Sequence, residues 1–132
     1  GIDASRLIFA PKMPLAKHLA RYRVADLALD TLPYGSHTTA SDALWAGCPI
    51  VALCGDTFAA RVCASILNAA GFPELSVNTL EEYEALAFRL TRDDAFKDSV
   101  RARLAQTKLE TPLFDSEQFT RGLEQLYRDV VS

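Results

Sequence analysis

Short apolar runs alternate with segments of helical spacing along the first 80 residues of the chain. The runs with strand character lie at 6–10, 27–29, 50–53 and 75–77. Helical spacing fills the intervals, at 15–22, 39–46 and 57–70. Strands that alternate with helices pair in parallel through right-handed crossovers. The sequence therefore predicts an α/β fold, a Rossmann-like parallel sheet with flanking helices, followed by C-terminal helices.

The length of 132 residues suits one core of ordinary size, so residues 1–132 are predicted to form a single lobe with a helical portion at 80–132. In the helix at 57–70 the predicted buried stripe consists of Phe58, Val62, Ile66 and Ala69. The last helix carries apolar residues at helical spacing: Phe119, Leu123, Leu126, Tyr127 and Val130. That face is expected to be buried, either on the chain's own sheet or against a partner.

Residues 29–47, LDTLPYGSHTTASDALWAG, place His37, Thr38 and Thr39 where a loop that follows a strand becomes a helix. Thr39 is expected to cap this helix, with Asp42 completing a capping-box-like pair, although the same pattern marks many ordinary helix starts. The first N–H groups of a helix have no partner inside it and favour anions such as phosphate. Asp42 lies about 5 Å further along the axis, an offset that suits a ribose attached to the phosphates.

The balance of 14 basic against 17 acidic residues excludes a generic nucleic-acid binder. Cys48, Cys54 and Cys63 are odd in number and match no zinc motif, which favours free thiols in a reducing compartment. No apolar run approaches the about 20 residues that span a bilayer. We therefore predict a cytoplasmic protein that binds neither nucleic acid nor a membrane.

Several strings carry a family resemblance. They are RLIFAP at 6–11, HLARYRVADLALDT at 18–31, HTT at 37–39 with SDALWAG at 41–47, GDTFAARVCASIL at 55–67, GFPEL at 71–75 and TPLFDSEQFTRGLEQLY at 111–127. Through these strings the chain resembles the O-linked N-acetylglucosamine transferases, in particular their bacterial homologues. The resemblance implies the C-terminal, donor-binding lobe of a GT-B type glycosyltransferase, whose second lobe this chain lacks.

The resemblance also implies that the ligand is a uridine diphosphate sugar. Position by position, six residues match those that bind it in the family: His37, Thr38 and Thr39 at the diphosphate, Asp42 at the ribose, and His18 and Arg21 beside the uracil. Animal members have a lysine at the position of Leu15. No residue of this chain is assigned as a catalytic base, and neither a metal nor another cofactor is expected.

The implied reaction moves N-acetylglucosamine from its uridine diphosphate carrier to serine or threonine hydroxyls of a protein acceptor, which upstream regions would bind. Two alternatives stay open, a related transferase with another donor such as GDP-fucose and a non-catalytic nucleotide-binding module. The isolated chain is expected to lack transferase activity, because the cleft needs two walls. The apolar face of the last helix, if exposed, would allow a homodimer of this chain.

Overall fold

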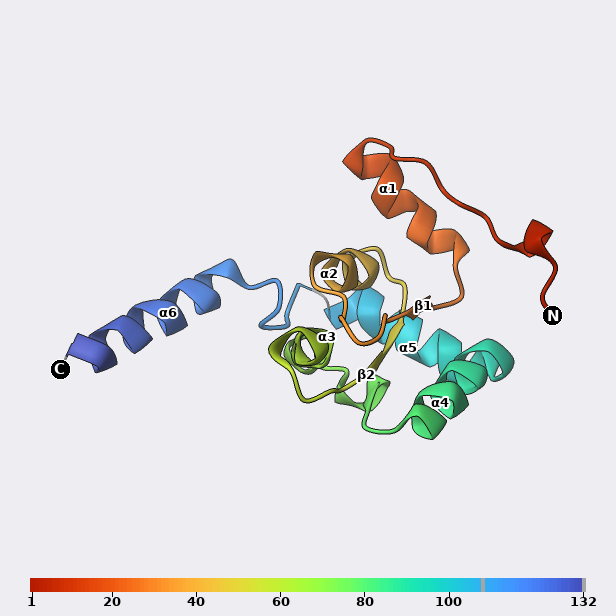
Figure 1. Ribbon diagram of the computed structural model, residues 1–132. Helices are drawn as coiled ribbons and strands as arrows, with labels where there is room; N and C mark the ends of the chain where they lie inside the picture. Colours follow the sequence, from red (N-terminus) through yellow and green to blue (C-terminus); the bar gives the residue numbers. More distant parts are fainter. Residues whose placement is uncertain (108, 132) are drawn as a thin grey trace.

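The computed structural model describes residues 1–107 and 109–131, with a three-stranded sheet at its centre (Figure 1). The central strand, β2 (Ile50–Leu53), lies between β1 (Ala28–Leu29) and β3 (Ser76–Val77). Both pairings are parallel, with Ala28 opposite Ile50 and Ala52 opposite Ser76. The predicted α/β class and parallel sheet are thereby confirmed.

Helices cover both faces of the sheet. The helices α2 (Thr38–Trp45) and α3 (Phe58–Ala69) connect successive strands and lie on one side, whereas α4 (Leu80–Arg92) packs on the other (Figure 1). A capping box between Thr79 and Glu82 starts α4, and Leu90 of this helix is buried in the core. A short 3-10 turn, η3 (Pro73–Leu75), leads into β3.

The helix α5 (Asp94–Thr107) crosses the amino ends of the strands. Arg101 donates a hydrogen bond to the carbonyl of Ala25, just before β1, and Arg103 donates one of 2.9 Å to the carbonyl of Gly71, ahead of β3. Leu104, on the inner side of this helix, is buried in the core. Because α5 occupies the amino ends, the carboxyl ends of the strands are left to the loops that follow β1 and β2.

The burial of α3 differs from the prediction by a rotation of the helix. Its buried residues are Ala60, Cys63, Ala64 and Leu67, whereas the predicted stripe of Phe58, Val62, Ile66 and Ala69 is exposed or only partly buried. The helix turns its small side chains toward the sheet, so that its backbone approaches the loops closely. The N–H groups of Gly35 and Gly55 donate to the carbonyls of Ala59 and Ala60, each at 3.2 Å.

The start of α2 also differs from the prediction. His37, not Thr39, is the N-cap residue, and no side chain caps the helix, so the expected pair between Thr39 and Asp42 does not form. The carbonyl of His37 accepts the first helical bonds, from Ala40 and Ser41. The helix ends before Gly47, which adopts a positive φ of 83° that suits glycine.

Residues 6–10 form no strand, which corrects the sequence-based prediction. A 3-10 turn, η1 (Ala4–Arg6), precedes an extended segment in which Ile8 and Phe9 are 89% and 91% exposed. This segment has strand-forming residues, but within the described residues the sheet consists of β1, β2 and β3, and a strand needs a neighbour to pair with. The helix α1 (Leu15–Arg21) and the turn η2 (Tyr22–Val24) then lead back to β1.

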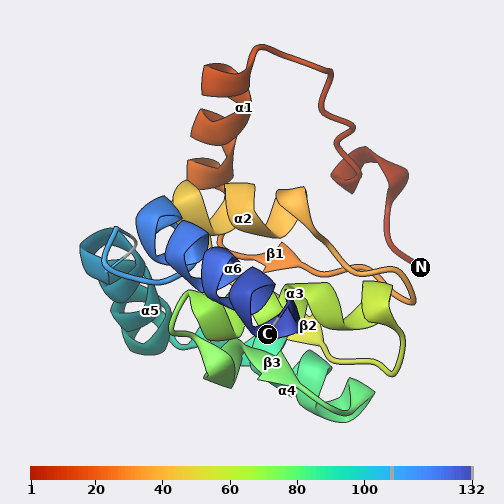
Figure 2. The ribbon, with the colours of Figure 1, turned by 90° about the vertical axis from the view of Figure 1, so that its left-hand side faces the viewer.

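The two ends of the chain extend away from the sheet. In both views α1 lies beside α2, and residues 1–14 extend beyond it (Figure 2). The helix α6 (Ser116–Val131) extends on another side and contains no buried residue, so its apolar face is not covered by the chain's own sheet. Among the described residues, no helix is long and apolar enough to cross a membrane.

Candidate functional site

The loop between β1 and α2 surrounds a hollow at the carboxyl end of the sheet. The hollow measures about 470 Å³ and is lined by Leu29, Thr31 and residues 34–39. In sheets of this type ligands bind at the carboxyl ends of the strands, where the connecting loops converge. The sequence placed the anion site at this loop, and His37, Thr38 and Thr39 all line the hollow.

His37 is held between two aromatic rings. Tyr34 stacks on its imidazole at 5.1 Å with an interplanar angle of 18°, and Phe58 meets it edge-on at 6.2 Å. The imidazole Nε2 is buried without a hydrogen-bond partner among the described residues. A buried polar atom without a partner costs free energy, so this nitrogen is suited to bind an oxygen of a ligand. Sequence reasoning missed Tyr34 and Phe58 as supports of His37.

The start of α2 adds backbone donors beside this imidazole. The first helical bonds run from Ala40 and Ser41, so the N–H groups of Thr38 and Thr39 lie ahead of the helical hydrogen-bond pattern. Both threonine side chains are exposed, and their hydroxyls are further donors. An anion at this position meets the positive end of the helix dipole.

The other three predicted residues form a chain of polar contacts between α1 and α2, one hydrogen bond and one ion-pair contact. Arg21 Nη2 lies 2.7 Å from His18 Nδ1, and His18 Nε2 lies 3.5 Å from Asp42 Oδ2. Because a guanidinium only donates, Nδ1 of His18 accepts, and in the neutral ring the proton is on Nε2, facing Asp42. Arg21 also donates to the carbonyl of Pro11 at 3.1 Å. Three residues that lie up to 24 positions apart are thereby brought together.

Asp42 connects the two groups of predicted residues. It follows Thr38 by four positions and Thr39 by three, so all three share one side of α2. Its side chain is 26% exposed and that of His18 is 27% exposed, so a ligand can reach both.

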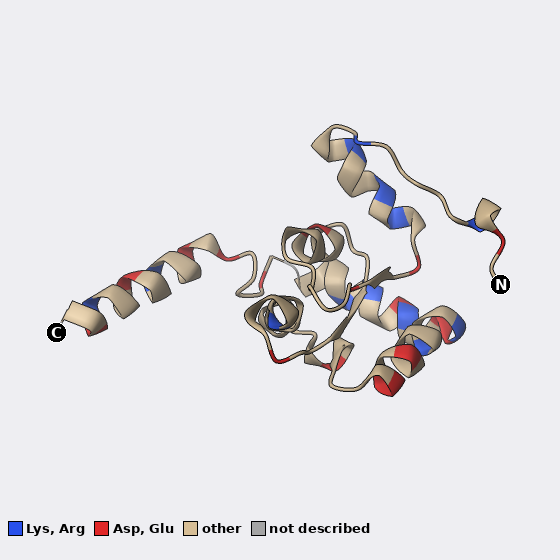
Figure 3. Ribbon diagram, in the orientation of Figure 1, with Lys and Arg blue, Asp and Glu red and all other residues tan. Residues whose placement is uncertain are grey.

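Lys and Arg residues are spread along α1 and the segment before it, whereas acidic residues gather at the start of α4 (Figure 3).

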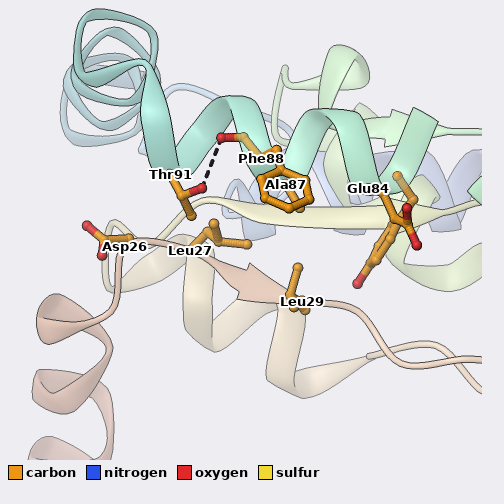
Figure 4. Close-up of a pocket in the computed structure, with 8 residues that line it drawn as sticks. Asp26, Leu27, Leu29, Glu84, Ala87, Phe88 and Thr91 are labelled. Carbon is orange, nitrogen blue, oxygen red and sulfur yellow. Dashed lines mark hydrogen bonds between the residues drawn. The ribbon is translucent and has the colours of Figure 1, made fainter. Parts of the chain in front are cut away.

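A second hollow, of about 510 Å³, lies between β1 and α4 and shares Leu29 with the first (Figure 4). Its other residues come from the segment just before β1 and from α4, with Leu27, Ala87 and Phe88 forming much of its wall. Its charged residues, Asp26 and Glu84, are both acidic. Asp26 is paired with Lys97 at 3.2 Å, but none of the residues that line this hollow is basic, so the loop before α2 remains the better candidate for an anion.

Known proteins are similar to this chain in sequence and in fold. Residues 1–123 match the family model described as Glycosyl transferase family 41. The UDP-N-acetylglucosamine--peptide N-acetylglucosaminyltransferase of Caenorhabditis elegans is 36% identical over 126 residues, which cover 96% of this chain and 11% of that protein. A solved mutant of the Thermobaculum terrenum O-GlcNAc transferase superposes with a TM-score of 0.81 at 41% identity, over 89% of this chain and 22% of that one.

The chain thus spans about a tenth of the nematode relative and about a fifth of the solved bacterial protein. The family match extends over nearly the whole chain, and the sequence and structure comparisons agree on it. The chain belongs to glycosyl transferase family 41.

Proposed function

We propose that this chain is the part of a protein O-GlcNAc transferase that binds uridine diphosphate N-acetylglucosamine. The observation that carries the proposal is the arrangement of His37, Thr38, Thr39, Asp42, His18 and Arg21 around the start of α2. The family match supports it, because the nematode relative is named for this donor and for a peptide acceptor.

In this proposal the site stabilises the leaving diphosphate. Negative charge builds on the diphosphate as the bond to the sugar breaks, and donors that are already in place lower that barrier. The N–H groups at the start of α2 and the hydroxyls of Thr38 and Thr39 are such donors, and the buried Nε2 of His37 joins them when it carries the imidazole proton. Asp42 accepts hydroxyls of the ribose, and the uracil lies beside His18 and Arg21.

The catalytic base and the binding of the protein acceptor are not assigned to the six residues of the proposed donor site. No side chain of this chain is proposed as the base toward the acceptor hydroxyl, and the protein acceptor is proposed to bind to regions beyond this chain. We further propose that the reaction uses no metal ion or other cofactor and takes place in the cytoplasm.

Calorimetry with uridine diphosphate and the 132-residue chain tests the proposal. Replacing Asp42 by alanine leaves charge-assisted hydrogen bonds unmade, so binding should weaken by about 1–3 kcal/mol, or about 5- to 150-fold. Asp98→Ala is the matched control, since Asp98 is an exposed carboxylate on α5, at the opposite end of the sheet. Its affinity should equal that of the wild type.

Adenosine and guanosine diphosphates serve as competing ligands in the same experiment. Equal affinity for uridine and adenosine diphosphates would contradict the placement of uracil beside His18 and Arg21. Tighter binding of guanosine diphosphate would favour a fucosyl donor instead. If no nucleotide binds, the determinants of binding lie outside this chain.

A further inference from the structure

Asp30 is a buried carboxylate at the end of β1, in the wall behind the candidate site. Its residue is 4% exposed, and none of the ion pairs among the described residues includes it. A buried charge without a counter-ion is costly unless hydrogen bonds compensate for its lost hydration. The compensation comes through Oδ1, which accepts two backbone hydrogen bonds, whereas Oδ2 is buried without a hydrogen-bond partner among the described residues.

The backbone of Asp30 is held by the neighbouring strand and by a helix that covers the sheet. Its N–H donates to the carbonyl of Val51 in β2 at 3.0 Å, and its carbonyl accepts from the hydroxyl of Tyr83 in α4 at 2.9 Å. The carboxylate thus projects from a point that both the sheet and the covering helix hold in place. Such a point can position a loop more firmly than the loop's own residues can.

The carboxylate closes the loop that follows. Its Oδ1 accepts the N–H of Thr31, at 2.9 Å, and the N–H of Ser36, the residue directly before His37. One oxygen therefore joins the first residue of the loop to its last. This arrangement leaves the backbone at Ser36 little freedom to move relative to β1.

Gly35 shows how tightly the loop is held. A Cβ at this residue would lie 2.9 Å from the carbonyl oxygen of Ala59 and 3.2 Å from Oδ2 of Asp30. The loop is thereby enclosed between the carboxylate and the first turn of α3, which also carries Phe58 against the imidazole of His37. The position of His37 follows from the closed loop.

We propose that Asp30 is a positioning residue for the diphosphate site: its carboxylate holds the loop of residues 31–36 closed and so fixes His37 between Tyr34 and Phe58. Asp30 itself does not touch the nucleotide. The expected effect on nucleotide binding rests on the proposed function. The closed loop and the fixed imidazole can be measured in the chain without any ligand.

Amide hydrogen exchange and the ring signals of His37 test the proposal in the ligand-free chain. The chain has two histidines, so the two ring signals are readily assigned. In Asp30→Ala the amide of Ser36 should exchange at least about tenfold faster, and the His37 ring signals should shift or broaden. Asp30→Asn keeps an acceptor oxygen and nearly the same size, so it should restore the protection of Ser36.

Nucleotide binding supplies the functional measurement. Affinity for uridine diphosphate should fall about tenfold in Asp30→Ala and stay within about threefold of the wild type in Asp30→Asn. Asp26→Ala removes an exposed carboxylate before the other end of β1 and serves as the control that leaves binding unchanged. The free energy of unfolding is measured for both variants, so that a loss of affinity in Asp30→Ala can be separated from a loss of folded protein.

Gly35→Ala provides a second variant in case Asp30→Ala fails to fold. It leaves the carboxylate in place but forces the loop away from Ala59 or Asp30, so it should shift the His37 signals and weaken binding. Unchanged His37 signals in a folded Asp30→Ala or Gly35→Ala chain would overturn the inference. If the wild type binds no nucleotide, the proposed function fails for this chain, while exchange and ring signals still decide the role of Asp30.

Discussion

Replacing Leu104 by alanine tests whether α5 is an integral part of the folded core. Leu104 is 1% exposed and packs in the same core cluster as Phe72 and Val100. Leucine-to-alanine changes at fully buried positions remove the transfer free energy of the side chain and leave a cavity, which together cost about 3–5 kcal/mol. The total stability of a domain is about 5–15 kcal/mol, so this variant should lose a large share of it.

Leu126→Ala in α6 is the matched control. It is the same substitution within a helix, so differences in helix propensity cancel. Leu126 is 62% exposed, and the loss of its remaining contacts should cost less than about 1 kcal/mol. The comparison is informative because α6 has the more regular apolar stripe of the two helices, so the sequence pattern alone favours burial of Leu126.

Urea unfolding followed by circular dichroism measures both variants. The midpoint should fall strongly for Leu104→Ala and little for Leu126→Ala, with an unchanged slope that indicates equal exposure of surface on unfolding. The experiment is run at low protein concentration, because self-association would bury Leu126. Equal losses in the two variants would refute the reasoning and mean that α6 packs on the body of the domain in solution.

Burial, followed by the charge of Asp30, raises the pKa of the Cys63 thiol from 9.0 to about 12, so the thiolate forms at lower pH in the unfolded chain than in the folded one. The free energy of unfolding should therefore fall as pH rises from about 9 toward 12. An equal fall in Cys63→Ala would contradict this assignment. Two copies of the chain are expected to bury the apolar face of α6 against each other. Sedimentation should then show a concentration-dependent dimer, which Leu123→Asp abolishes. A wild-type monomer at high concentration would exclude the dimer. The purified chain should transfer no sugar to a peptide acceptor, and measurable turnover would instead identify His37 as the first candidate for a base.

The sequence by itself determined the order of the elements from β1 to β3 and the loop that carries the candidate site. The buried run Ile50–Leu53 has no polar residue and forms β2 with the predicted bounds. Gly47, with its positive φ, marks the end of α2, as a left-handed residue does after many helices. These features depend on neighbouring residues in the chain, so local pattern suffices to predict them. The family resemblance likewise lies in contiguous strings.

Only the tertiary structure decided which partners these elements find. Residues 6–10 have strand-forming side chains but no neighbouring strand among the described residues, and the side of α3 that is buried depends on how closely its small residues approach the sheet. The contact of His18 with Asp42 and the bond from Ser36 to Asp30 join residues of different elements or opposite ends of a loop. Such contacts form only when the chain closes on itself, because pairing and burial are properties of two surfaces and a sequence pattern describes one.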